Sequence, residues 1–256
     1  MLPSITIITP TLNQARFIEQ TIVSVLTQNY PRLEYFVIDG GSTDGTIDIL
    51  KRYENYLTWI SEPDKGQVDA INKGIRKSTC EIIAYLNSDD YYEPGALLTV
   101  GSFFQTHPKV KILTGKCKNV DVHGIEYRPL VTIYKNIFLL SKAWGFLKIC
   151  NFISQPSTFW KKELSDSLGL FNPLYHYAMD YDFWLRVARV EKINFVNRYL
   201  ANFRIYPLSI TSSNSKAQFK EEYEIASKFS NLFEIFLHKI HSTLSFLVYS
   251  LINRNN

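Results

Sequence analysis

Short apolar runs alternate with amphipathic helical patterns through the first hundred residues, and this alternation constrains the fold more than any other feature. The apolar runs lie at residues 4–10, 34–40, 57–61 and 81–86. Apolar residues recur at helical spacing in residues 15–28, 47–53, 68–78 and 94–106, the last opening with Pro94. Strands that are apolar on both faces and separated by helices are typical of parallel sheets covered on both sides. The sequence therefore predicts an α/β fold with a doubly wound, mostly parallel sheet.

The second half of the chain has a more mixed pattern. A strand is expected at residues 109–115 and a hairpin-like turn at His123-Gly124. An apolar segment from Ile133 to Ile149 is interrupted by lysines, and residues 218–252 are helical in pattern. We expect the sheet to be followed by a C-terminal helical extension.

Composition limits the class of protein. An apolar content of 46% supports a full hydrophobic core in 256 residues. The cysteines form no CxxC pair and no zinc pattern, and no signal-peptide pattern opens the chain, so a cytoplasmic location is expected. Residues 1–130 carry 13 basic and 15 acidic side chains, whereas residues 131–256 carry 15 and 9. The basic half predicts an anionic partner such as a phosphorylated acceptor or a membrane surface, with ordinary surface variation as the alternative. No nucleic-acid partner is expected.

Polar clusters follow each of the four expected strands. In chain order they are TPTLN at residues 9–13, DGGSTDGT at 39–46, SEPDKG at 61–66 and NSDD at 87–90. Each cluster alone is also a good turn sequence. Ligands of open α/β sheets bind at the carboxyl ends of the strands, and four clusters on that edge are harder to explain as turns. The sequence therefore predicts a binding site there.

This edge is rich in carboxylates and lacks the common nucleotide-binding loops. Neither GxxxxGK[ST] nor a GxGxxG after the first strand is present. The carboxylates that follow the strands would repel a diphosphate unless a divalent cation lay between them; they are Asp39, Asp64, Asp89 and Asp90. Mg²⁺ and Mn²⁺ prefer such oxygen ligands and often combine one or two carboxylates with substrate phosphates. Asp89 and Asp90 are the predicted metal ligands, with a turn or capping role as the alternative.

The order of these motifs resembles that of the family 2 glycosyltransferases, which have the GT-A fold. The resemblance covers at least residues 4–206, and its landmarks are TPTLN, DGGSTDGT, EPDKGQVDAINKG, LNSDDYYEPGAL, ISQPSTFW and MDYDFWLR. It implies an enzyme of the hexosyltransferase type, which moves a sugar from a nucleotide diphosphate sugar to an acceptor hydroxyl with inversion. We expect a glycosyltransferase domain at residues 1–215, with a nucleotide-binding half at about 1–110 and an acceptor half at about 111–215. An amphipathic helical extension is expected at 216–256.

The resemblance places the donor nucleotide against the first polar loops. Thr9, Pro10 and Asn13 are expected to shape the nucleobase pocket, and Asp64 to line its nucleoside side. Asp39 is expected to accept a hydrogen bond from the imide N–H of the base. Uracil and thymine carry this donor, guanine carries a related one, and neutral cytosine has none. UDP or dTDP sugars are therefore favoured, and a CMP sugar is disfavoured.

The same resemblance assigns the diphosphate and the metal to later positions. Asp89 is expected to bind Mn²⁺ or Mg²⁺, supported by Asp90 or water. The other expected donor contacts are Lys73, Asn87, Ser88 and Arg204. Asn87 stands where relatives more often carry Asp, and a solvated helix lysine is an equal alternative for Lys73. Many relatives have a His where this chain has Tyr206.

The catalytic base is expected on the acceptor side, in the segment HYAMDYDFWLRV at residues 176–187. The resemblance points to Asp180, which follows Met179 where relatives often have Glu. Asp182 is the nearby alternative, and a helix N-cap role is the alternative for Asp180. A carboxylate in this position can take the proton of the attacking hydroxyl.

Apolar residues recur at a spacing of three and four from Phe233 to Leu251, and polar and charged residues interrupt them, so no membrane span is expected. This pattern is typical of a helix on a membrane surface, of packing against the catalytic domain, or of a homo-oligomer interface. A glycan or lipid-linked acceptor of a cell-surface polysaccharide, reached from the inner face of the cell membrane, would account for it.

Two other function classes fit the sequence less well. A sugar nucleotidyltransferase shares the sheet architecture but requires a Gly-rich basic loop after the first strand, and TPTLNQARF lacks the glycines. A non-catalytic module that binds nucleotide sugars would keep the pocket without the base. The presence of both Asp89 and Asp180 argues against that module.

Overall fold

The computed structural model describes residues 1–207, 209 and 213–254, with side chains as far as residue 246. The strands are β1 (Ile5–Thr11), β2 (Leu33–Asp39), β3 (Thr58–Ser61), β4 (Ile82–Tyr85), β5 (Tyr91–Tyr92), β6 (Ile112–Val120), β7 (Thr158–Lys161) and β8 (Asn194–Arg204). The helices are α1 (Ile18–Leu26), α2 (Thr46–Arg52), α3 (Gln67–Lys77), α4 (Ala96–Thr106), α5 (Pro129–Ser141), α6 (Lys162–Leu168), α7 (Met179–Ala188), α9 (Ser215–Phe229) and α10 (Leu232–Arg254), with short 3₁₀ helices η1 (Trp144–Lys148) and η2 (Gln155–Ser157).

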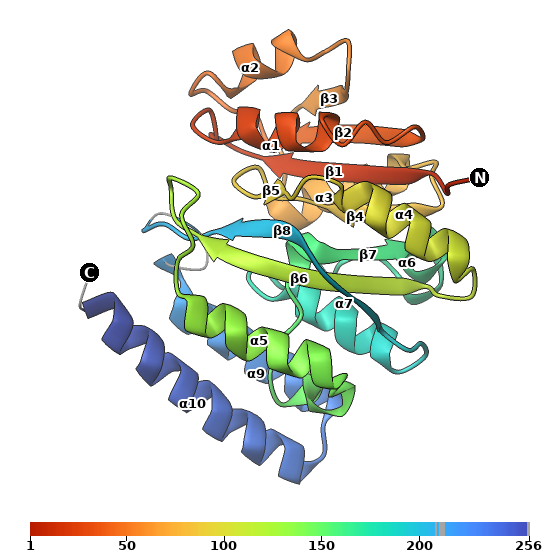
Figure 1. The fold of residues 1–256 in the computed structure, drawn as a ribbon. Coiled ribbons are helices and arrows are strands. Elements are labelled where there is room, and N and C mark those ends of the chain that lie inside the picture. Colours follow the sequence, from red (N-terminus) through yellow and green to blue (C-terminus); the bar gives the residue numbers. More distant parts are fainter. Residues whose placement is uncertain (208, 210–212, 255–256) are drawn as a thin grey trace.

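The strands form one sheet in the order β3-β2-β1-β4-β7-β6-β8-β5 (Figure 1). β1 pairs in parallel with β2 and β4, and β2 pairs in parallel with β3. β6 and β8 are also parallel, whereas β7 is antiparallel to both its neighbours and β5 is antiparallel to β8. The mostly parallel α/β sheet predicted from the sequence is confirmed, and β7 is the strand that joins its two parallel parts.

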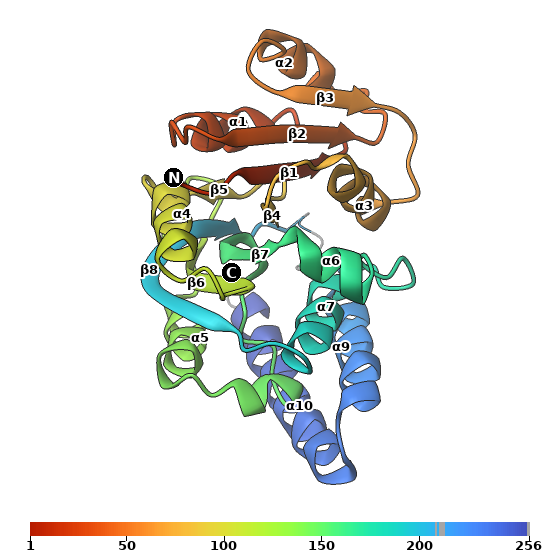
Figure 2. The same cartoon turned by 90° about the vertical axis from the view of Figure 1, so that its right-hand side faces the viewer.

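Helices cover both faces of the sheet. Buried side chains of α1 and α4, including Ile22 and Val100, form one hydrophobic cluster with β1 and β2. Buried side chains of α3 and α7, including Ile71 and Trp184, form a second cluster with the opposite faces of β1, β2 and β4. Alternate residues of a strand point to opposite faces, so continuous apolar strands supply both cores. The resulting arrangement leaves the carboxyl ends of β1 to β4 at one edge (Figure 2).

Two expected helix limits differ from those in the structure. Pro94 does not open α4, because the helix begins at Ala96 after Gly95, whose φ of +75° is a left-handed conformation that glycine adopts readily. The single helical pattern at 218–252 divides into α9 and α10. Asn231 and Glu234 form a reciprocal capping pair there: Glu234 N donates to Asn231 Oδ1 at 2.9 Å, and Asn231 N donates to Glu234 Oε2 at 2.8 Å. With Asn231 as its N-cap, the new helix α10 begins at Leu232, two residues after the extended Ser230.

The last two helices pack against the rest of the molecule. α9 contacts α7, and its Ile225 and Ala226 are buried in the same cluster as Trp184. α10 lies beside α5, where the Tyr134 hydroxyl and His241 Nε2 are 2.7 Å apart (Figure 1). Among the described helices, none combines the length and the continuous apolar character that a membrane span requires. The domain limit at residue 215 stays a prediction.

Candidate active site

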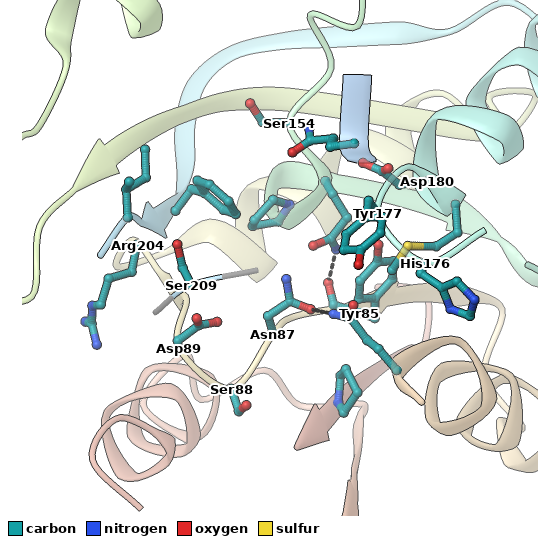
Figure 3. A pocket seen from close by; sticks show the side chains of 18 of the residues that line it. Tyr85, Asn87, Ser88, Asp89, Ser154, His176, Tyr177, Asp180, Arg204 and Ser209 are labelled. Atoms are coloured by element: carbon teal, nitrogen blue, oxygen red, sulfur yellow. Dashed lines mark hydrogen bonds between the residues drawn. The ribbon is translucent and has the colours of Figure 1, made fainter. Parts of the chain in front are cut away.

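A cavity of about 430 Å³ opens at the carboxyl ends of β1, β3 and β4, the edge that the sequence predicts. Of the twelve predicted site residues, seven line it: Pro10, Asp64, Asn87, Ser88, Asp89, Asp180 and Arg204. The other five lie outside the lining: Thr9, Asn13, Asp39, Lys73 and Asp90. Figure 3 shows Asp89 and Asp180 on different sides of this cavity. One space therefore brings together the predicted metal ligand and the predicted base.

The loop after β4 is held in place by three other segments. Asn87 Oδ1 accepts a hydrogen bond from Gln67 Nε2 of α3 at 2.7 Å (Figure 3). Asp89 Oδ2 accepts one from the Tyr206 hydroxyl at 3.0 Å, and burial raises the pKa of this half-buried carboxyl. The Thr21 hydroxyl of α1 lies 2.9 Å from the Ser88 carbonyl oxygen and 2.7 Å from that of Asp90. These contacts fix the Asp89 side chain toward the cavity.

Asp90 faces away from the cavity. Its Oδ1 accepts a hydrogen bond from the backbone N–H of Arg204 at 2.8 Å, and the residue is only 1% exposed. Burial and the neighbouring Asp89 raise the pKa of Asp90 well above its usual range, which favours the protonated form. In this arrangement Asp90 ties β8 to the loop after β4.

The residues at the cavity fit a divalent cation that receives few protein ligands. In the described part of the chain, no group of three or more His, Cys, Asp or Glu side chains is placed to hold a metal ion. Asp89 supplies one hard oxygen ligand at the cavity wall, beside the amide of Asn87. Mg²⁺ and Mn²⁺ are often bound by one or two carboxylates together with substrate phosphates and water. The donor set therefore suits an ion shared with a diphosphate.

The Arg204 guanidinium is enclosed at the edge of the cavity. Its Nη2 donates to Gln20 Oε1 at 2.7 Å, and its central carbon lies 4.4 Å from the ring centre of Phe17 and 5.4 Å from that of Tyr91. Such stacking stabilises a desolvated cation. Arg204 is only 2% exposed, so its charge acts on the cavity mainly through space.

The predicted nucleobase residues are largely engaged in hydrogen bonds with neighbouring strands and loops of the protein. The Asp39 carboxylate is fully buried and accepts hydrogen bonds from Gly41 N and Ser42 N, both at 2.9 Å, from Ser61 Oγ at 2.6 Å and from Ser42 Oγ. Asn13 Oδ1 accepts from Thr43 N at 2.8 Å. Thr9 Oγ1 lies 3.1 Å from the Tyr35 hydroxyl. Asp39, Asn13 and Thr9 thus shape the loops around the cavity without lining it.

Asp64 and Lys73 differ in their access to the cavity. Asp64 lines it and accepts a hydrogen bond from Gly66 N at 2.8 Å. The Lys73 ammonium pairs with Glu62 at 2.9 Å and with Asp69 at 3.3 Å on the outer side of α3. The placement of Lys73 favours the alternative given above, a lysine on the solvated face of a helix.

Asp180 lies in the first turn of α7 and lines the cavity, and its Oδ1 accepts a hydrogen bond from Tyr181 N at 2.8 Å. Burial raises its pKa to about 6, against the opposing effects of that hydrogen bond and of Lys135. A carboxylate with a pKa near neutrality is suited to accept a proton. Asp182 points elsewhere, since it pairs with Arg186 at 2.9 Å within α7. The geometry favours Asp180 over Asp182 as the base.

Several lining residues are not identified by the sequence analysis. Lys135 comes from α5, Gln218 comes from α9, and His176 and Tyr177 precede α7. Gln155, inside the ISQPSTFW motif, donates from Nε2 to the Tyr85 carbonyl oxygen at 2.6 Å, while its Oε1 is buried without a hydrogen-bond partner among the described residues. Gln155 lies in the ISQPSTFW motif, and His176 and Tyr177 open the segment HYAMDYDFWLRV, so these three carry a local signal. Lys135 and Gln218 come from segments whose sequence pattern indicates only apolar or helical character.

Solved structures of other proteins share this fold. The mannosyltransferase of Pyrobaculum calidifontis, in complex with GDP-Man and Mn²⁺, is similar at a TM-score of 0.72 and 21% identity, over 95% of this chain and 69% of that one. Residues 1–349 of Staphylococcus aureus TarS, in complex with UDP-GlcNAc, are similar at a TM-score of 0.68 and 20% identity, over 87% of this chain and 64% of that one. At these identities the likeness shows the fold, the GT-A fold expected from the sequence.

Curated relatives share its sequence. An uncharacterized glycosyltransferase of Rickettsia felis is 27% identical over 247 residues, which are 93% of this chain and 39% of that protein. A putative teichuronic acid biosynthesis glycosyltransferase of Bacillus subtilis is 36% identical over 100 residues, 37% of this chain and 39% of that protein. The chain thus spans about two fifths of the length of these two relatives. The family model described as glycosyl transferase family 2 matches residues 6–164, more than half of the sequence. The chain belongs to glycosyltransferase family 2.

Proposed function

We propose that this protein is an inverting, metal-assisted glycosyltransferase that uses a UDP or dTDP sugar as donor. The observation that carries this proposal is the meeting of Asp89 and Asp180 in one cavity, at the carboxyl ends of parallel strands. Asp89 provides a ligand for the ion beside the diphosphate, and Asp180 provides a base with a pKa near 6. Family membership and fold support the same reaction class.

The reaction is a single displacement at the anomeric carbon of the donor sugar. Asp180 takes the proton of the acceptor hydroxyl while its oxygen attacks that carbon. The bond from the anomeric carbon to the diphosphate oxygen breaks on the opposite face, and the nucleoside diphosphate leaves. When bound, Mn²⁺ or Mg²⁺ stabilises the negative charge that develops on the leaving diphosphate. The carboxylate of Asp89 and the amide of Asn87 orient the donor from the other wall.

The nucleotide is placed against Pro10 and Asp64, with Asp39 behind them in the DGGSTDGT loop. The two structural relatives bind UDP-GlcNAc and GDP-Man, so the fold accommodates both pyrimidine and purine nucleotides. Uracil, thymine and guanine all carry an imide or related N–H group, which can donate a hydrogen bond to a carboxylate. This chemistry is compatible with the proposed UDP or dTDP donor, applies equally to a guanosine nucleotide, and disfavours a cytidine nucleotide.

The exposed sides of α5 and α10 suit contact with a membrane surface that presents the acceptor. Large apolar side chains are exposed there: Leu130, Ile133, Ile137 and Leu140 on α5, and Leu232, Phe233, Phe236, Ile240 and Leu244 on α10. α5 carries no acidic residue, and Glu234 of α10 is paired with Lys148 at 3.2 Å. Apolar side chains near basic ones suit the interface of an anionic bilayer. We therefore place the protein peripherally on the inner face of the membrane, acting on a glycan or lipid-linked acceptor.

A panel of nucleotide sugars tests the donor class. Purified protein with Mn²⁺ or Mg²⁺ should release UDP or dTDP from one member of the panel, and release should be faster with the correct acceptor. Binding without release of nucleotide would favour a non-catalytic module. Release of pyrophosphate from a nucleoside triphosphate and a sugar phosphate would favour a nucleotidyltransferase.

A further inference from the structure

Glu221 of α9 forms a clamp on the backbone just before α7. Its carboxylate accepts hydrogen bonds from three successive N–H groups: His176 N at 2.9 and 3.1 Å from the two oxygens, Tyr177 N at 2.7 Å and Ala178 N at 3.0 Å. Ala178 is the N-cap of α7 and has no side chain that could cap the helix. A residue more than forty positions later therefore satisfies N–H groups at this helix start.

The clamped segment carries cavity residues. His176 and Tyr177 line the cavity, and Asp180 follows two residues after the last clamped N–H (Figure 3). Residues 176–178 lead directly into the first turn of α7, so a shift of this backbone would carry Asp180 with it.

Helix α9 also contributes to the cavity lining, through a residue about one turn before Glu221. Gln218 lines it, and its Nε2 donates to Glu222 Oε1 at 3.1 Å. Glu222 is half-buried near Asp180: burial, together with the charge of Asp180, raises the pKa of Glu222 to about 7, against the opposing effects of Gln218 and Lys135. α9 therefore contributes three side chains to this region. Gln218 lines the cavity, Glu222 lies near Asp180, and Glu221 binds the backbone just before α7.

We propose that α9 is a working part of the active site and that Glu221 is the positioning residue for Asp180. This inference rests on the proposed function, because Asp180 is the base there. Hydrogen bonds to a carboxylate are about twice as strong as neutral ones, and a negative charge at a helix start is further stabilised by the helix dipole. A neutral amide in place of the carboxylate keeps one acceptor oxygen but loses the charge and the second acceptor, so the bonds to residues 176–178 weaken and Asp180 shifts relative to the acceptor hydroxyl.

The test compares Glu221→Gln with Glu224→Gln on the same helix. Glu224 is an exposed residue whose carboxylate pairs with Lys228 at 3.2 Å and, among the described contacts, bonds to none of residues 176–178, so it serves as the matched control. Misplacement of a catalytic group by about 1 Å can cost about 100-fold in rate. Glu221→Gln should therefore lower kcat by about 10- to 100-fold with little change in the donor KM, whereas Glu224→Gln should match the wild type.

Two further measurements separate positioning from general loss of structure. Deuterium uptake of a peptide that covers residues 176–178 should be faster in Glu221→Gln and unchanged in Glu224→Gln. Glu221→Asp keeps the charge and should recover part of kcat. Wild-type kcat and wild-type uptake in Glu221→Gln would overturn the inference, as would a loss of donor binding that parallels the loss of kcat.

The outcome for the reaction itself is distinguishable. If the wild-type protein transfers from no donor of the panel, the proposed function fails, and the uptake experiment alone then decides whether Glu221 holds residues 176–178. If the wild type transfers and Glu221→Gln transfers equally well, only the inference about α9 fails.

Discussion

The hydroxyl of Tyr206 donates a hydrogen bond to Asp89 Oδ2 at 3.0 Å, which joins the segment after β8 to the loop after β4. Burial and the nearby Asp89 raise the pKa of Tyr206, so the hydroxyl stays protonated and remains a donor. The Tyr206 ring also lies against Phe17, with ring centres 5.0 Å apart. Tyr206 thus orients the predicted metal ligand at the position where many relatives carry a His.

Activity is expected to depend on a divalent cation held through Asp89. EDTA should abolish transfer, and Mn²⁺ or Mg²⁺ should restore it. Asp89→Ala should be inactive at any metal concentration while its melting temperature stays close to that of the wild type. Asp48→Asn is the matched control, because Asp48 is exposed on α2 and far from the cavity edge. Tyr206→His adds a metal ligand and should lower the metal concentration needed for half-maximal rate. Full activity in EDTA would contradict the metal assignment.

Asp180→Asn should remove the base and leave the donor site intact. General base catalysis contributes on the order of 10²–10⁴ in rate, so kcat should fall by about that factor while calorimetry shows unchanged nucleotide binding. Asp182→Asn breaks the buried pair with Arg186 and should lower the melting temperature, with a milder effect on kcat. The assignment is wrong if Asp182→Asn is the dead variant and Asp180→Asn keeps its turnover.

The pH dependence follows from the raised pKa of Asp180. The base must be unprotonated, so kcat/KM should fall as the pH drops below about 6 and reach a plateau above it. Asp180 binds its proton more tightly in the folded state than in the unfolded state, because folding raises its pKa. The ionised carboxylate therefore lowers the free energy of unfolding, and this effect is fully present above about pH 6. Asp180→Asn should therefore have a higher melting temperature than the wild type at pH 8, and a smaller difference at pH 5. Lys135→Ala removes a neighbouring cation and should shift the acid limb of the pH profile. An acid limb at the same pH in this variant would contradict Asp180 as its origin.

Nucleotide selectivity should depend on the DGGSTDGT loop. Asp39→Ala removes the acceptor of its four hydrogen bonds and should weaken UDP or dTDP binding by about 1.5–3 kcal/mol. Lys73→Ala serves as a control, because Lys73 pairs with Glu62 and Asp69 away from the cavity. Isothermal titration calorimetry with UDP, dTDP and CDP makes the measurement. UDP binding unchanged by Asp39→Ala would contradict the role of this loop, and CDP binding as tight as UDP binding would contradict the proposed selectivity.

Peripheral membrane binding should require the exposed apolar side chains of α5 and α10. The wild-type protein should co-sediment with vesicles that contain anionic phosphatidylglycerol, less so with neutral vesicles, and the double variant Ile137→Ser/Phe236→Ser should stay in solution. Tyr56→Ser is the matched control, since Tyr56 is 70% exposed in the turn between α2 and β3. Equal sedimentation of all three proteins would rule out this surface.

Local patterns were sufficient for much of the nucleotide half. The apolar runs that became β1, β2 and β4 and the polar clusters after them can be recognised in the sequence, because side-chain alternation and turn composition are local properties. The parallel pairing of these strands follows from the helices between them. That pairing brings Asp64 and Asp89 to one edge, so their common location could be predicted.

The directions of individual side chains in the site depend on contacts that no local pattern encodes. Asp89 and Asp90 are adjacent, yet one lines the cavity and the other binds the backbone of Arg204. The clamp of Glu221 on residues 176–178 joins α9 to the start of α7. These choices depend on hydrogen bonds and packing between segments far apart in the chain, and the spacing of residues within one segment carries no information about them. Local patterns therefore predicted the parallel strands of the nucleotide half, the edge at which they end and the candidate acidic residues, whereas β5, β7 and β8 and the choice of which acidic residues face the cavity depend on packing between distant segments.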